Sequence, residues 1–135
     1  MVGPVIAFVA LTFVVWAVMF AKRIPFIQRS NFPIETFRSR HTAAEAFTPV
    51  AAPADNLQNL FEMPVLFYAL AAVVLATGTH VAFIVPLAWA YVLLRAAHSF
   101  IHCTYNAVMH RFGVYLASCL VLLAMWVLFA IAWLG

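Results

Sequence analysis

The stretch from Arg95 to Arg111, RAAHSFIHCTYNAVMHR, concentrates ionisable and polar side chains in a chain that is otherwise almost wholly apolar. On a helix of 3.6 residues per turn, six side chains in and just before this stretch fall within an arc of about 80°. They are Tyr91, Arg95, His98, His102, Asn106 and Met109. Because a charged side chain at bilayer depth costs about 2.5 to 3.5 kcal/mol, Arg95 requires a partner there. We therefore interpret this polar stripe as the candidate functional face.

The composition places the stripe in a membrane protein. The 135 residues are 67% hydrophobic and 8% charged, with a mean hydropathy of +1.05, well outside the range of ordinary soluble domains. The net charge of +3 includes no dense lysine or arginine cluster, which excludes a nucleic-acid partner. The two cysteines, Cys103 and Cys119, have neither metal-site nor disulfide-scaffold spacing, and we predict free thiols.

Hydropathy predicts an all-α integral membrane protein, multi-pass, folded as a single four-transmembrane-helix bundle over residues 1–135. The predicted spans are about residues 2–21, 55–77, 81–109 and 112–134, with one long loop over about residues 22–54. Pro64 predicts a kink in the second span. The short connection at residues 78–80 predicts that the second and third spans pack as an antiparallel hairpin. The loop has two interpretations, a partly ordered linker or a folded flap over a membrane site.

The basic residues predict the orientation of the bundle. Four spans place the long loop and the turn near Arg111 on one side, and both termini and the turn at His80 on the other. Every lysine and arginine outside the spans lies on the first side. By the positive-inside rule that side is cytoplasmic, so the termini are non-cytoplasmic.

Depth counting brings two helices together. Helix rise from the non-cytoplasmic surface places Arg95 about 20 Å deep and Glu62 about 22 Å deep. We therefore predict an ion pair between them, with Asn59 one turn nearer the cytoplasm supplying further hydrogen bonds. Such groups can also simply hold helices together. His98 and His102 add more polar chemistry than one helix clamp needs, which favours a polar, partly hydrated pocket open to the cytoplasm.

Other kinds of site fit the residues less well. His98 and His102 have the i, i+4 spacing of a helical zinc pair, and Glu62 could supply a third ligand. Arginines close by would oppose a divalent cation, so we predict no metal site. Ser99 lies at the edge of the stripe, but no acid is placed to form a hydrolase triad with it.

On these residues the chain resembles the MAPEG family, the membrane-associated proteins in eicosanoid and glutathione metabolism, and in particular its bacterial-type members. The resemblance covers most of the chain and rests on the four-span layout and on six residues. They are Asn59, Glu62, Pro64, Arg95, His98 and Arg111. It implies a homotrimer in the bacterial inner membrane, with glutathione bound from the cytoplasmic side between adjacent subunits.

The resemblance also implies roles for individual residues. The implied glutathione-binding residues are Arg23 (or Lys22), Asn59, Glu62, Arg95, His98 and His102. Arg111 is similar to the arginine credited with stabilising the glutathione thiolate, and it is our catalytic candidate. A free thiol with a pKa of about 8.5 is a poor nucleophile at neutral pH, so a fixed guanidinium would favour the reactive thiolate.

Two positions depart from the family pattern. His102 stands where glutathione-dependent members commonly carry tyrosine, and Gln58 stands where some carry arginine. Two functions therefore stay open. One is a glutathione-dependent transferase or peroxidase acting on a lipophilic small molecule from the bilayer. The other is a non-catalytic trimer that binds lipid or serves as a structural subunit of a membrane complex.

Overall fold

The computed structural model describes residues 1–135, and all of its regular structure is helical. The helices are α1 (Val2–Ser30), α2 (Arg40–Ala46), α3 (Ala52–Asn59), α4 (Pro64–Thr77), α5 (Ile84–Cys103) and α6 (Val108–Leu134), with short 3-10 helices at Ile34–Phe37 and Thr48–Val50. Four segments are long and apolar enough to cross a membrane, namely α1, α3 with α4, α5 and α6. The protein is therefore a multi-pass integral membrane protein, as its composition predicts.

The first helix is longer than the predicted span at residues 2–21. It continues through Lys22 and Arg23 to Ser30 and contains Pro25. The helix ends where Asn31 adopts the left-handed conformation (φ 45°). The predicted loop is correspondingly shorter and is folded. Phenylalanine rings pack on one another there, from Phe26, Phe32, Phe37 and Phe47.

The second span is two helices and not one kinked helix. Residues 60–63 interrupt the helical backbone, and Pro64 begins α4. Proline suits this position because the amide that it lacks would have no intrahelical partner there. Glu62 consequently lies in the interruption, outside either helix. This break decides the geometry of the candidate site.

The third span is shorter than the predicted residues 81–109. Helix α5 ends at Cys103, and Asn106 adopts a left-handed conformation (φ 48°) while its amide donates to the Ile101 carbonyl at 2.8 Å. Asn106 and Met109 therefore leave the predicted polar stripe, a correction that follows from this turn. Helix α6 begins at Val108, so Arg111 lies in its first turn and not in a connecting turn.

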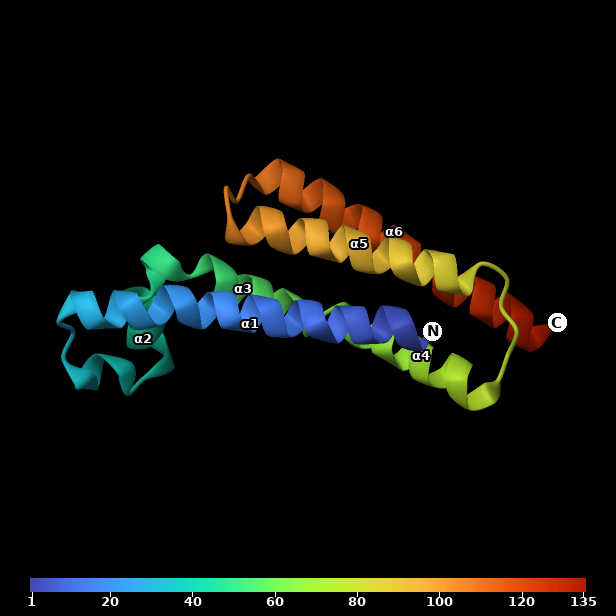
Figure 1. The fold of residues 1–135 in the computed structure, drawn as a ribbon, viewed down its shortest axis with the longest axis horizontal. Helices are drawn as coiled ribbons and strands as arrows, with labels where there is room; N and C mark the ends of the chain where they lie inside the picture. Colours follow the sequence, from blue (N-terminus) through green and yellow to red (C-terminus); the bar gives the residue numbers. More distant parts are fainter.

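The helices pack as two antiparallel pairs (Figure 1). Helix α5 lies along α6, and α1 lies along α3 and α4, while α1 and α3 also contact α5. The second and third spans run antiparallel, as predicted, although residues 78–83 form a longer connection between them. Both termini lie toward the end that carries this connection, and α2 and the α5–α6 turn lie at the opposite end.

Phe8 occupies the centre of the packing between α1, α4 and α5. It is fully buried, and its ring centroid lies 5.6 Å from Phe67, 5.6 Å from Tyr68 and 5.8 Å from Tyr91. Phe67 also stacks on Tyr91 at 4.8 Å. Because lipid chains are as apolar as these rings, close packing rather than transfer from water holds the helices together here.

Replacing Phe8 with alanine should therefore destabilise the protein by about 3 kcal/mol, through the cavity left among three aromatic rings. Unfolding in mixed micelles at increasing denaturing detergent measures the change. Phe13→Ala is the matched control, since that ring is 66% exposed on the same helix. Equal losses of stability in the two variants would contradict the assignment of Phe8 to the core.

Candidate functional site

Arg95 on α5 is fully buried, and its Nη2 atom donates a hydrogen bond to the backbone carbonyl of Asn59 at 2.9 Å. Asn59 is the last residue of α3, and the break that follows leaves its carbonyl without a backbone partner. A guanidinium is a favourable partner for the negative end of a helix dipole. Arg95 therefore caps α3 from the neighbouring helix.

The predicted ion pair between Glu62 and Arg95 is wrong within the single chain. Glu62 is exposed, and its Oε1 atom accepts only a long hydrogen bond of 3.5 Å from Gln58 Nε2. The one ion pair in the structure joins His41 to Glu45. The depth count assumed an unbroken second span, whereas the interruption before Pro64 leaves Glu62 exposed and outside either helix.

The two histidines of the stripe are buried one turn apart on α5. Their rings meet edge to face at 5.6 Å. His98 Nδ1 lies 3.2 Å from the Arg111 carbonyl, and because a carbonyl only accepts, Nδ1 carries the proton and donates. In the neutral ring, Nε2 of His98 is then an unprotonated acceptor. The structure thus links His98 to the backbone of Arg111.

The Arg111 side chain is held by the turn before α6. Its Nη1 atom donates to Asn106 Oδ1 at 2.6 Å, and the left-handed conformation of Asn106 brings that amide round to it. Arg111 is half-buried. Asn106 is therefore a positioning residue for Arg111, a role that the prediction of a continuous helix through residue 106 concealed.

Several buried polar atoms in this region have no hydrogen-bond partner within the chain. They are Nε and Nη1 of Arg95, Nε2 of His98, Nδ1 of His102 and the hydroxyl of Tyr91. Buried polar groups in proteins are nearly always paired, and each unpaired one costs about 1 to 3 kcal/mol. We call these five atoms the unpaired row, and they can supply both donors and an acceptor to a polar ligand.

Tyr115 on α6 is a member of the site that sequence reasoning missed. Arg95 lies over its ring, with Cζ 5.4 Å from the centroid, and the His98 ring lies 5.7 Å from it. Such a cation–π contact lowers the cost of burying the guanidinium. The sequence contained one signal for Tyr115: it lies four residues after Arg111, and residues four apart share a helix face.

Arg23 lies apart from this cluster within the single chain. Its guanidinium stacks on Phe47 at 4.5 Å, and it lines a cavity with Asp55 and Gln58. Lys22 instead donates to the Cys103 carbonyl at 2.8 Å, at the end of α5. The structure thus brings Asn59, Arg95, His98, His102 and Arg111 together in one region. Arg23 lines a separate cavity, and Glu62 is exposed at the break before Pro64.

The C-terminal end of α5 also contacts α3 through polar side chains. The buried amide of Asn56 accepts a hydrogen bond from Ser99 Oγ at 3.4 Å and points its Nδ2 atom at Cys103 Sγ, 3.5 Å away. Both cysteines are free thiols. No group of three or more histidine, cysteine, aspartate or glutamate side chains is arranged to hold a metal ion.

Comparison with known proteins adds one match. The model of the MAPEG family matches residues 1–131, whereas no curated protein and no solved structure shows significant similarity to the chain. The match covers the first three membrane spans, most of the fourth, and every residue of the site described above. The chain therefore belongs to the MAPEG family.

Proposed function

We propose that this protein is a glutathione-dependent membrane transferase or peroxidase that acts on a lipophilic electrophile. In this proposal it is a homotrimer of the bacterial inner membrane, with the long loop cytoplasmic, the termini non-cytoplasmic and the sites between adjacent subunits. Membership of the MAPEG family supports a glutathione-related or lipid-metabolic role in general terms. The observation that carries the proposal is the unpaired row.

The chemistry of glutathione matches the groups that the chain leaves without partners. The tripeptide has two carboxylates, an ammonium group, two peptide groups and a thiol. The free N–H groups of Arg95 suit a carboxylate or peptide oxygen, and His98 Nε2 suits an N–H donor. Glu62 is exposed and has no cationic partner in the chain, so its carboxylate is available to an ammonium group.

In this proposal Arg111 acts on the sulfur of glutathione. The glutathione thiol releases its proton to water, and the guanidinium held near the sulfur stabilises the resulting thiolate. The thiolate then forms a bond from sulfur to the electrophilic carbon while the displaced electron pair departs with the leaving group. Asn106 fixes the guanidinium through the 2.6 Å hydrogen bond, which limits the motion that would weaken this stabilisation. The lipophilic substrate would enter from the bilayer.

Glutathione binding is the first test. Calorimetry on the purified full chain should detect binding of glutathione, and addition of a generic lipophilic electrophile should give the sulfur conjugate. Because the unpaired row supplies several hydrogen bonds, His98→Phe should weaken binding at least tenfold, at about 1.5 kcal/mol for the lost acceptor. Absence of both binding and conjugation in the unaltered protein would refute the proposal.

Arg111 and Asn106 allow a graded test of thiolate stabilisation. Arg111→Ala should abolish the ultraviolet absorbance of the bound thiolate and leave the oligomer intact. Asn106→Gly keeps a residue that tolerates positive φ but removes the Oδ1 acceptor, so it should lower the thiolate fraction by less than Arg111→Ala does. Arg38→Ala, an exposed arginine of the cytoplasmic segment, is the control. Unchanged absorbance in Arg111→Ala would assign the thiolate to another group.

A non-catalytic trimer is the second candidate, favoured by the departures from the family pattern at His102 and Gln58. Under this candidate, Arg95→Ala dissociates the oligomer and glutathione does not bind. Under the first candidate, Arg95→Ala weakens glutathione binding while native mass spectrometry still detects the trimer. The two measurements on one variant separate the candidates.

A further inference from the structure

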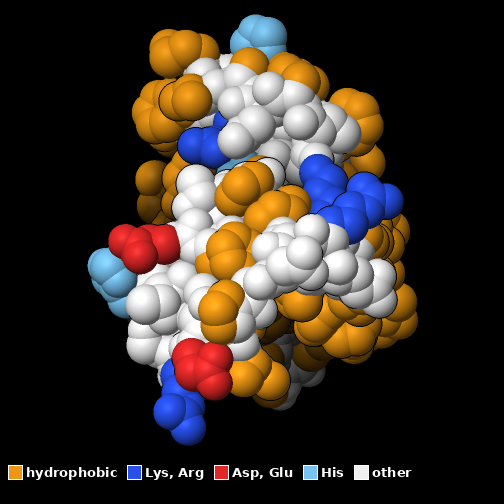
Figure 2. All heavy atoms as spheres, turned by 90° about the vertical axis from the view of Figure 1, so that its left-hand side faces the viewer, with side chains coloured by type: hydrophobic (Ala, Val, Ile, Leu, Met, Phe, Trp, Pro, Cys, Tyr) orange, Lys and Arg blue, Asp and Glu red, His pale blue; other side chains and the backbone are white.

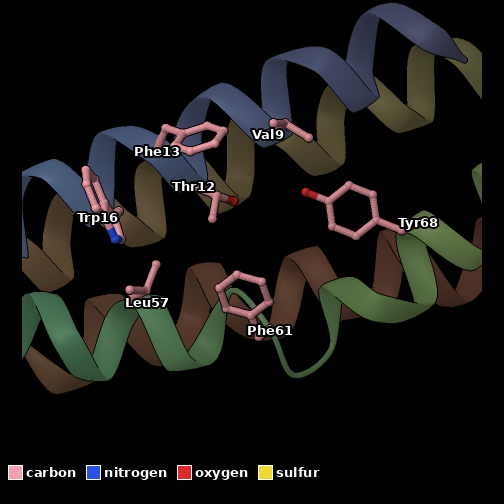
Figure 3. Close-up of a pocket in the computed structure, with 7 residues that line it drawn as sticks. All are labelled: Val9, Thr12, Phe13, Trp16, Leu57, Phe61 and Tyr68. Atoms are coloured by element: carbon pink, nitrogen blue, oxygen red, sulfur yellow. The ribbon is translucent and has the colours of Figure 1, made fainter.

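The break between α3 and α4 leaves two backbone amides without partners. Bonding after α3 ends at Phe61, whose amide donates to the Gln58 carbonyl at 2.9 Å, and it resumes at Val65, whose amide donates to the Glu62 carbonyl at 3.2 Å. The amides of Glu62 and Met63, between these two, make no backbone hydrogen bond. Figure 3 shows this connection beside Phe61, where the chain leaves α3 and turns before it enters α4. The N-terminal end of α4 therefore presents free N–H groups within a membrane span.

Arg95 supplies a second, independent set of free donors at the same break. Its side chain is fully buried, and its Nη2 atom donates to the carbonyl of Asn59, the last residue of α3, at 2.9 Å. Its Nε and Nη1 atoms are buried and have no hydrogen-bond partner. The guanidinium is thus held against the break by one hydrogen bond and keeps unpaired N–H groups there.

No acid in the chain neutralises the positive charge at the break. The N-terminus of a helix attracts anions through its dipole, and a guanidinium is a full cation. The one ion pair in the structure joins His41 to Glu45, and Glu62 is exposed with its Oε1 atom near Gln58. Figure 2 shows other lysine and arginine side chains at the surface of the end that carries α2, where water hydrates them. Arg95 has no such exposure, so its charge requires an anion.

The free donors define the class of ligand. They are all N–H groups, so the ligand must accept several hydrogen bonds and carry negative charge. Glu62 and Met63 are neighbours in the chain, with Cα atoms about 3.8 Å apart, so one small ion can accept from both amides. A monovalent ion balances the single charge of the guanidinium. Broken membrane helices of transporters likewise direct a helix N-terminus at an anionic group.

We propose that a small monovalent anion, represented by chloride, binds at this break between the Arg95 guanidinium and the amides of Glu62 and Met63. One part of this rests on the proposed function, because the N–H groups of Arg95 that hold the anion are those assigned above to an oxygen of glutathione. The anion therefore competes with glutathione and regulates its binding. When glutathione is absent, the anion neutralises the buried guanidinium.

Thermal unfolding of the full chain in neutral detergent tests the anion site. Chloride replaces gluconate, a bulkier anion, at constant ionic strength, so that general screening does not change. Because an ion that binds only the folded state stabilises it, the unfolding midpoint should rise by about 4 °C at a chloride concentration of about ten times the dissociation constant. Equal midpoints in chloride and gluconate would overturn the proposal.

Paired variants assign the effect to the break. Arg95→Gln keeps an N–H donor for the Asn59 carbonyl but removes the charge, so it should abolish the rise in midpoint, whereas Arg38→Gln removes an exposed arginine and should not. Met63→Pro removes one amide at a residue whose φ of −57° suits proline, and it should raise the chloride dissociation constant about tenfold. Met63→Leu keeps the amide and is its control.

The Met63 pair decides the matter if Arg95→Gln does not fold. A full chloride effect in folded Arg95→Gln, or equal chloride dissociation constants for the two Met63 variants, would show that the ion binds elsewhere and would overturn the proposal.

Calorimetry with glutathione tests the competition. At constant ionic strength, the apparent dissociation constant of glutathione should rise about elevenfold at about ten times the chloride dissociation constant, the ratio for two ligands that exclude each other. An unchanged glutathione affinity would refute the competition. A protein that is stabilised by chloride but binds no glutathione in gluconate would retain the anion site and refute the proposed function instead.

Discussion

The hydrogen bond from Arg95 to the last carbonyl of α3 is the constraint on which the site depends. A buried guanidinium needs acceptors, and an interrupted membrane helix exposes carbonyls that need donors. The Arg95 guanidinium supplies the donor that the free carbonyl at the end of α3 needs, and that carbonyl supplies an acceptor for the guanidinium. The break before Pro64 and the arginine on α5 therefore form one structural feature. It fixes the distance between the second and third spans at the depth where the polar stripe lies.

A second set of contacts fixes α6 against α5. Asn106 adopts the left-handed conformation in the turn that follows α5. Its side-chain oxygen accepts a hydrogen bond from the Arg111 guanidinium. The backbone carbonyl of Arg111 in turn accepts a hydrogen bond from His98. The same short turn therefore sets the tautomer of a stripe histidine and the direction of the candidate catalytic guanidinium. The backbone of the turn thus holds the polar side chains of His98 and Arg111 in fixed positions within an otherwise apolar chain.

The number of spans could be predicted from the sequence, because it follows from hydropathy and helix length. The ends of the helices could not be predicted, since Pro64 permits either a kink or a break, and an asparagine permits but does not require the left-handed turn that follows α5 at Asn106. The ion pair from Glu62 to Arg95 was wrong for this reason. A count of residues gives depth, but it does not give the direction of a side chain beyond a helix break.

The unpaired N–H groups of Arg95 and the exposed carboxylate of Glu62 have no partners within the single chain. Pairing Glu62 with Arg95 would have satisfied both within the chain, whereas the observed fold leaves a carboxylate exposed and guanidinium N–H groups unpaired. A membrane interior offers little water to compensate such groups, so ligands or neighbouring subunits must. The buried Nε atom of Arg23 also has no hydrogen-bond partner within the chain. The same requirement for hydrogen-bond partners thus supports the proposal of a ligand site within the bundle.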